Sequence, residues 1–343
     1  MKNTASTWIA ALACALCPLF AGAAAPAATE LLAQAREAAG GAAWDRVAQL
    51  EAHGRIVTSG LPGQWQRVDD LRRGRFTEAS DVGVFRVAEG FDGTQRWRQD
   101  PSGGVHALDA PFSRAMSVTD AWLARRGWLR DEAGVELGPV ATREQGGHAA
   151  DVVTATPPGG QAVELWFDAR THLLARSVRR MPISTQAVAY ADYRAVDGLQ
   201  LPHRIEAGEV GSSNLDTVTV ASWTRTAPRD AAFAQRRPPA DTTLAAPSTV
   251  PIEVDGEVTL QATLNGRPFD FILDTGGHDI ITPAVAQALG LKAVGAGESG
   301  GAGRTKRVAR GVVQASTSTT SRLLEPRSPA STWNGNCRPS TAR

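Results

Sequence analysis

The sequence predicts an α+β fold that is mainly β, with a large curved antiparallel sheet, or half-barrel, and a few helices. Short segments that alternate apolar and polar residues, separated by Gly, Pro and Asp turns, recur from residue 53 to residue 223. Only a few stretches there have helical periodicity. A proline-rich segment at residues 236–250 then interrupts every pattern, so we place a linker there and expect a domain on each side.

The first 25 residues are typical of a secretory signal peptide. Lys2 supplies a positive charge, residues 8–20 form a short apolar run, and Ala21-Gly22-Ala23 offers a small-x-small cleavage site. No later stretch reaches the roughly 18 apolar residues that a membrane helix needs. Cys14 and Cys17 lie inside the run, in a poor context for lipid attachment. We therefore expect a soluble protein that is periplasmic or secreted.

Charge and cysteine content narrow the partners and the source of stability. The formal net charge of the 343 residues is +1, which argues against a nucleic-acid partner. Removal of the signal leaves Cys337 as the last cysteine, so apolar burial, and not disulfides, must hold the fold. No metal and no other cofactor are expected.

The first domain, expected at residues 29–235, begins with helical sequence. We expect a helix at residues 31–40, ended by Gly40-Gly41, and a second amphipathic piece at residues 44–50. Residues 113–128, rich in Ala, Leu and Trp, predict a further helix. Alternating strands are expected at residues 64–71, 83–88, 151–156, 164–167, 174–178 and 218–223.

Four phrases in this domain resemble bacterial periplasmic proteins with the LolA-like fold of lipoprotein-sorting carriers. They are AGGAAW at 39–44, GFDG at 90–93, LWFD at 165–168 and DYRAVDGLQLP at 192–202. That fold is a half-barrel closed by helices around an apolar cavity, so the resemblance, over residues 29–228, implies a cavity for a lipid or another apolar ligand. Each phrase also has a local explanation, since Asp-Gly pairs form tight turns and Leu-Pro ends a strand.

Beyond the linker, the pattern of a β-hairpin is clear. A strand is expected with apolar residues alternating at Val258, Leu260, Ala262 and Leu264. Asn265-Gly266 follows, which favours a type I′ turn. The return strand, residues 268–273, leads directly into Asp274-Thr275-Gly276. Thr282 is then expected to cap a short helix that ends at Gly290.

This order of elements resembles the first half of a retropepsin-like aspartyl protease domain. Residues 272–277, Ile-Leu-Asp-Thr-Gly-Gly, are similar to the family's Leu-Leu-Asp-Thr-Gly-Ala, with Gly277 in place of the common Ala. The resemblance implies a domain at residues 251–303 in which Asp274 is catalytic, Thr275 bonds across to a partner loop, and Gly276 lets backbone N–H groups approach the carboxylate.

The chemistry of this motif needs two carboxylates around one water. Two nearby carboxylates share a proton, so the ionised one acts as general base on the water and the protonated one donates to the scissile carbonyl. The chain has one Asp-Thr-Gly; Asp216-Thr217-Val218 and Asp241-Thr242-Thr243 lack the glycine. As in retroviral enzymes, the second carboxylate would come from another copy, so activity on a peptide or protein substrate implies a homodimer.

A glycine-rich segment follows where the family places the flap that closes over substrate. Residues 295–303 contain Gly297, Gly300 and Gly301, which we expect to contact substrate if the segment is a flap, or to belong to an ordinary flexible loop if it is not. His278 and Asp279, beside the motif, are interpreted as polar groups that brace the loop, because no Cys or second His lies at ligand spacing.

The tail at residues 304–343 departs from the family. It is rich in Ser, Thr and Arg, has Glu325 as its only acidic residue, and shows no strand alternation apart from Val312-Val313 and Leu323-Leu324. This composition is typical of a GC-rich gene read out of frame, or of a naturally disordered tail. The half of the domain that supports Asp274 is then missing.

Two hypotheses therefore follow from the sequence. The first is an exported aspartic endopeptidase of retropepsin type, with the possibility that truncation has inactivated it. The alternative is a non-catalytic periplasmic protein that binds a lipid or another apolar ligand through the first domain.

Overall fold

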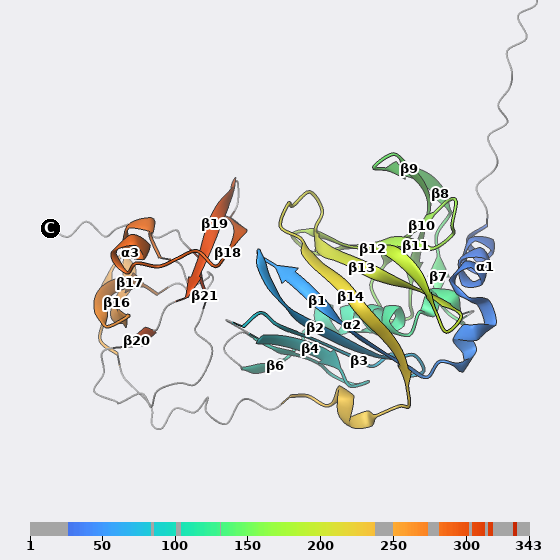
Figure 1. Ribbon diagram of the computed structural model, residues 1–343, viewed down its shortest axis with the longest axis horizontal. Coiled ribbons are helices and arrows are strands. Elements are labelled where there is room, and N and C mark those ends of the chain that lie inside the picture. Colours follow the sequence, from blue (N-terminus) through green and yellow to red (C-terminus); the bar gives the residue numbers. More distant parts are fainter. Residues whose placement is uncertain are drawn as a thin grey trace, which may run out of the picture.

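The computed structural model describes residues 27–83, 86–100, 104–130, 132–236, 250–273, 281–301, 304–312, 315–317 and 332–334 (Figure 1). The expected signal peptide, most of the expected linker and Asp274-Thr275-Gly276 lie outside these residues. Within them, no helix is both long enough and apolar enough to cross a membrane.

One antiparallel sheet dominates the structure, as the sequence predicts. Its strands are β1 (Gln49–Thr58), β2 (Leu61–Asp70), β3 (Phe76–Asp81), β4 (Arg86–Phe91), β5 (Arg96–Gln99), β6 (Val105–Ala107), β7 (Glu136–Leu137), β8 (Ala141–Gln145), β9 (His148–Thr156), β10 (Val163–Asp168), β11 (Leu174–Arg180), β12 (Thr185–Val196), β13 (Leu199–Glu209) and β14 (Asp216–Thr226). Their order is β6-β5-β4-β3-β2-β1-β14-β13-β12-β11-β10-β9-β7, with β8 also on β9. The sheet is therefore two meanders joined where β1 pairs with β14, and it does not close.

The helices of this region lie beside the curved sheet. They are α1 (Ala28–Ala39), the 3-10 turn η1 (Gly41–Arg46), α2 (Pro111–Ala124), η2 (Gly127–Leu129) and η3 (Asp230–Phe233). α1 contacts β13 and η2, and α2 contacts β5 and η2. Figure 1 shows α2 on the concave side of the sheet.

Gly40 allows two of the LolA-like segments, residues 39–44 and residues 192–202, to approach each other closely. It ends α1 with φ of 126°, and a Cβ built there would lie 2.4 Å from the Gly198 carbonyl oxygen. Gly198 belongs to the Asp197-Gly198 turn between β12 and β13, where both residues have positive φ. A larger residue than glycine at position 40 would therefore force the first helix away from the sheet.

The C-terminal region contains two small sheets. In one, β16 (Glu257–Leu264) pairs with β15 (Ile252–Asp255), β17 (Arg267–Ile272) and β20 (Ala315–Thr317), and α3 (Pro283–Ala288) packs beside it. In the other, β19 (Arg304–Val312) pairs with β18 (Gly295–Gly301) and β21 (Thr332–Asn334).

Several local expectations differ from the structure. The helix expected at residues 113–128 is divided into α2 and η2, and the strand expected at residues 83–88 is β4, which begins at Arg86. Residues 44–50 do not form one amphipathic piece, because η1 ends at Arg46 and β1 begins at Gln49. Leu-Pro does not end a strand, because Pro202 lies inside β13. Pro202 lies opposite Tyr193 of β12 on one side. On the other side, β14 pairs with β13 only from Arg204 to Ala207, so no β14 carbonyl requires an N–H from Pro202. The last difference is β19, which forms after Gly303 because backbone pairing with β18 needs no alternation of side chains.

Candidate functional site

The hairpin that leads to the Asp-Thr-Gly motif has the expected geometry. β16 and β17 pair antiparallel from Leu264 and Arg267 outward. Asn265 and Gly266 connect them, with φ of 46° and 77°. Positive φ at both positions is what a type I′ turn requires, and Asn-Gly supplies it at low cost. This turn sets the register between β16 and β17, the strand that precedes Leu273 and Asp274 in the sequence.

Both ends of the segment that carries the motif are held in place. The backbone N–H of Leu273 donates to the Val258 carbonyl oxygen at 2.8 Å. At the other end, the Ile281 side chain is buried, and the Thr282 hydroxyl accepts from the Val285 N–H at 3.1 Å as the N-cap of α3. Residues 274–280, with Asp274, Thr275, Gly276, His278 and Asp279, lie between these anchors and outside the described residues.

A small core supports these two anchors. Among the described residues of this region, Leu264 and Ile281 are its fully buried apolar side chains. Partly buried residues pack against them, namely Phe269, Phe271, Val285, Ala286, Leu289 and Leu291. The alternating face of β17 and the inner face of α3 therefore meet at this core.

The segment expected to act as a flap is one strand of a hairpin. β18 pairs with β19 in a register that places Gly297 opposite Val308, Gly300 opposite Thr305 and Gly301 opposite Arg304. β19 also pairs with β21, so this hairpin is part of a three-stranded sheet. A glycine-rich hairpin is the kind of element that can act as a flap. Its contact with a substrate stays a prediction.

A second candidate site is a cavity of about 440 Å³ on the concave side of the large sheet. Part of its lining is apolar and comes from α1, η1, η2 and the strands β11, β13 and β14, including Ala35, Trp44, Leu129, Leu174, Leu201 and Trp223. The volume is in the range of small-molecule sites. The resemblance to the LolA-like fold implied a cavity for an apolar ligand, and the apolar part of the lining agrees with that expectation.

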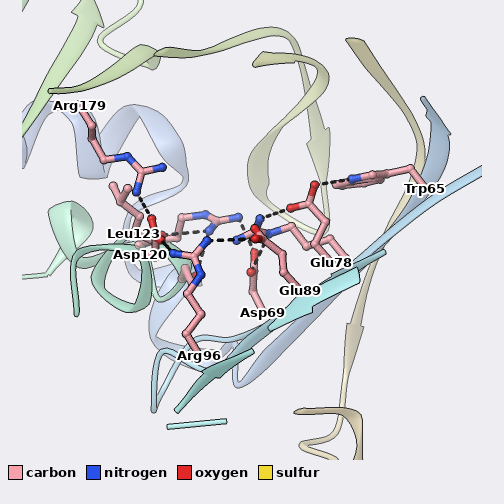
Figure 2. A network of polar contacts seen from close by, with 11 residues as sticks. Trp65, Asp69, Glu78, Glu89, Arg96, Asp120, Leu123 and Arg179 are labelled. Atoms are coloured by element: carbon pink, nitrogen blue, oxygen red, sulfur yellow. Dashed lines mark hydrogen bonds and ion pairs between the residues drawn. The ribbon is translucent and has the colours of Figure 1, made fainter. Parts of the chain in front are cut away.

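The rest of the lining is charged, which the sequence analysis did not predict. One group centres on Asp120 of α2, whose carboxylate pairs with both Arg96 of β5 and Arg179 of β11 (Figure 2). Arg96 also contacts Glu89 of β4 at 3.2 Å. The side chains of Arg96 and Asp120 are 11% exposed, so these charges interact in a largely desolvated setting.

A second group centres on the fully buried Asp69 of β2. Its two carboxylate oxygens accept from Arg67 at 2.8 Å and from Arg126 at 3.1 Å. Arg67 donates also to Glu78 of β3 at 2.6 Å, and the Trp65 indole N–H donates to the same carboxylate at 2.8 Å. Figure 2 shows Trp65, Glu78 and Asp69 along this line of contacts.

Phe76 of β3 joins the two groups. The guanidinium carbons of Arg67 and Arg96 lie 5.4 Å and 5.7 Å from the centre of its ring. Burial opposes the charge on Arg67, but the attraction of Asp69 and Glu78 outweighs it and raises the pKa of Arg67. Burial likewise opposes the charge on Arg96, and Asp120 and Glu89 raise its pKa. Both guanidiniums therefore stay charged in the cavity wall.

The residues that β2 contributes to this charged wall could have been predicted from the alternation of its sequence. Leu61, Trp65, Arg67 and Asp69 are all odd-numbered, so they lie on one face of the strand. Polar residues at inward positions are unusual in a half-buried strand. They could have indicated a polar cavity in place of a wholly apolar one. In the described part of the chain, no cluster of three or more His, Cys, Asp or Glu side chains is arranged to hold a metal ion.

Comparison with known families concerns the C-terminal region. Residues 260–323 match the sequence model of the aspartyl protease family. This match confirms the resemblance read from the sequence, contains Asp274-Thr275-Gly276, and runs past residue 303 into the segment that was expected to be a tail. A comparison with curated proteins finds no match.

Solved structures similar to the chain include members of the LolA superfamily. One from Nitrosomonas europaea matches with a TM-score of 0.43 and 13% identity, over 62% of this chain and 99% of that one. An outer membrane lipoprotein-sorting protein domain from Vibrio parahaemolyticus matches with a TM-score of 0.40 and 10% identity, over 60% and 95%. A DUF1329 family protein from Desulfovibrio piger matches with a TM-score of 0.40 and 12% identity, over the same shares.

Proposed function

We propose that the chain is an exported aspartic-type endopeptidase in which Asp274 from each of two copies forms the catalytic pair. The observation that carries the proposal is the match of residues 260–323 to the aspartyl protease family, since these residues include Asp274, which follows β17 and Leu273 in the sequence. The anchors at Leu273 and Ile281 support it, because a catalytic loop must be held in a fixed position.

The reaction is the hydrolysis of a peptide bond by water. One Asp274 carboxylate, ionised, takes a proton from the water, and its partner, protonated, donates to the scissile carbonyl oxygen. Thr275 and Gly276 shape the loop, and Gly297, Gly300 and Gly301 of the β18–β19 hairpin close over the substrate backbone. The pair titrates as a unit, so activity requires a pH at which the two carboxylates hold one proton.

The test is cleavage of an unfolded protein and of a fluorogenic peptide mixture at acidic and neutral pH. Asp274→Asn removes the ionisable pair, and we expect the rate to fall by a factor of about 100 or more. Asp270→Asn, an exposed position four residues earlier on β17, is the matched control and should keep full activity. Cleavage that survives Asp274→Asn would exclude the proposal, as would a wild-type chain with no activity at any pH.

We propose ligand binding in the cavity of the large sheet as a second function. The specific observation that favours it is an interior of about 440 Å³ with a partly apolar lining, where a solidly packed core would have left no such space. A fluorescent fatty acid should bind to the purified chain, and Trp223 of the lining should report its arrival by a change in fluorescence. A chain that binds no fluorescent fatty acid would contradict this function.

Export to the periplasm or beyond is part of both proposals. It is supported by the charge, the apolar run and the cleavage site of residues 1–25. Fractionation of cells that express the full chain, with the N-terminus of the product sequenced, should find the protein outside the cytoplasm and cut after Ala23. Uncut protein in the cytoplasm would contradict it.

A further inference from the structure

We propose that the charged part of the cavity wall is a head-group site, and that the cavity selects single-chain amphiphiles with an anionic head, a carboxylate or a phosphate, over neutral ones. This inference rests on the ligand-binding function proposed above for the same cavity. It assigns Arg96, Arg98 and Arg179 as the residues that recognise the head.

The lining of the cavity has two kinds of surface. Apolar side chains such as Leu201 and Trp223 come from β13 and β14, whereas the ion-paired side chains come from β2–β5, β11 and α2. A wholly apolar ligand would lie against these ion pairs without adding a hydrogen bond to them, and a wholly polar ligand would leave the apolar part of the wall without an apolar contact. An amphiphile satisfies both.

The side chains around Asp120 carry more positive than negative charge. Three guanidiniums, those of Arg96, Arg98 and Arg179, line the cavity with two carboxylates, Asp120 and Glu89. Arg98 lies two residues from Arg96 on β5 and opposite Glu89 of β4. Arg67 and Arg126, by contrast, are balanced by Asp69 and Glu78. The one other lining carboxylate, Asp216, is exposed at the beginning of β14. Arg98 is exposed as well, but it lies on the same strand as Arg96, so the group around Asp120, taken without Asp216, has one positive charge in excess, which favours an anion.

The same side chains supply hydrogen-bond donors. Each guanidinium has five N–H donors. The guanidiniums of Arg96 and Arg179 share the single carboxylate of Asp120, so it can accept from only some of their donors. The Nε atom of Arg96 is buried and has no hydrogen-bond partner among the described residues. Arg98 is exposed to the cavity. A buried donor without an acceptor is costly, and a ligand carboxylate or phosphate brings acceptors in pairs.

The experiment compares three ligands that share one tail, namely dodecanoate, dodecyl phosphate and dodecanol. Each is titrated below its micelle concentration against the purified full chain loaded with a neutral fluorescent probe. We expect at least one of the two anions to bind about tenfold or more tightly than dodecanol, the size of one added charge-assisted hydrogen bond. Whichever anion binds more tightly distinguishes a fatty acid from a phosphate head.

Variants then test the named residues. Arg179→Gln and Arg98→Gln should each reduce the preference for the anion by about tenfold while dodecanol binding stays the same. Arg180→Gln is the matched control, since Arg180 is exposed on the other face of β11 and should change nothing. Asp120→Asn, which frees two guanidiniums, should strengthen anion binding, whereas a purely structural role for Asp120 predicts weaker binding of every ligand.

The possible results distinguish failure of the head-group site from failure of ligand binding in the cavity. Equal binding of all three ligands would overturn the head-group site and leave ligand binding in place. Failure of all three to bind would overturn both. An Arg180→Gln variant that behaves like Arg179→Gln would show that general surface charge, and not the cavity wall, attracts the anion, and would also overturn the inference. Arg98→Gln, at an exposed position, keeps the test available if Arg179→Gln does not fold.

Discussion

The large sheet encloses a continuous core of buried Trp, Leu, Val and Phe side chains, whereas the C-terminal region buries only Leu264 and Ile281 completely among its described residues. The same C-terminal region leaves Ile252, Val254 and Leu273 half-exposed or more. The first region can therefore be stable by itself. The described residues of the second region bury far less apolar surface, and the homodimer proposed above would cover more of it.

The largest expected effect comes from the core of the large sheet. Phe167 of β10 is fully buried, so Phe167→Ala should lower the free energy of unfolding of this region by about 3–5 kcal/mol. Chemical denaturation followed by Trp fluorescence measures the loss, because most of the Trp residues lie in this region. A change below about 1 kcal/mol would mean that the core around Phe167 is loosely packed, and it would contradict the difference in burial between the two regions.

Leu264→Ala tests the small core of the C-terminal region in the same way. Removing this side chain should cost about 2–5 kcal/mol, more than a core of this size can lose without unfolding. We expect peptidase activity to disappear while the fluorescent fatty acid still binds in the cavity. Loss of ligand binding in this variant would contradict the independence of the two regions. Thr263→Ala, the neighbouring position on β16, serves as the control.

The cap of α3 tests a smaller effect in the same region. Thr282→Ala removes the hydrogen bond from the Val285 N–H and should destabilise the C-terminal region by about 1 kcal/mol. Gln287→Ala, at an exposed position of the same helix, should be within about 0.5 kcal/mol of wild type. Equal effects of the two variants in thermal denaturation would mean that α3 does not anchor the loop of Asp274.

The smallest expected effect is the pH dependence of one turn in the large sheet. Burial would raise the pKa of Asp168, but hydrogen bonds from Thr171 and Arg170 outweigh it and lower that pKa. A lowered pKa in the folded state means that this turn contributes stability above pH ~4, which is lost as the pH falls through the lowered value. Asp168→Asn should remove this part of the acid sensitivity in urea titrations. Asp109→Asn, at an exposed position, should not; an identical response of the two would refute the assignment.

Sequence patterns predicted those parts of the structure that local interactions determine. The Asn265-Gly266 turn, the Thr282 cap and the end of α1 at Gly40 follow from the backbone preferences of single residues, and the structure has all three. Alternation predicted segments that overlap six strands of the large sheet, namely β2, β4, β9, β10, β11 and β14. The turn and the cap lie on either side of residues 274–280, which include Asp274.

The ion pairs around Asp120 depend on contacts that no local pattern contains. Arg96, Asp120 and Arg179 are separated by tens of residues in the sequence, and they meet only because β5, α2 and β11 surround one interior. Pro202 was misinterpreted for a related reason. Whether a proline ends a strand depends on which neighbour pairs with it, and that is a property of the sheet. β19 was missed because it is held by backbone pairing with β18.

The central claim is that two copies of Asp274 make one active site, and a subunit-mixing experiment tests it most directly. Wild-type chain is mixed with an equal amount of the Asp274→Asn variant, left to exchange, and assayed for peptide cleavage. With random pairing, half of the wild-type chains enter inactive mixed dimers, so the activity per wild-type chain should fall to about one half. The Asp270→Asn chain, mixed in the same way, should leave the activity undiminished. Activity per wild-type chain that is unaffected by the Asp274→Asn partner would contradict the claim, because each chain would then cleave alone.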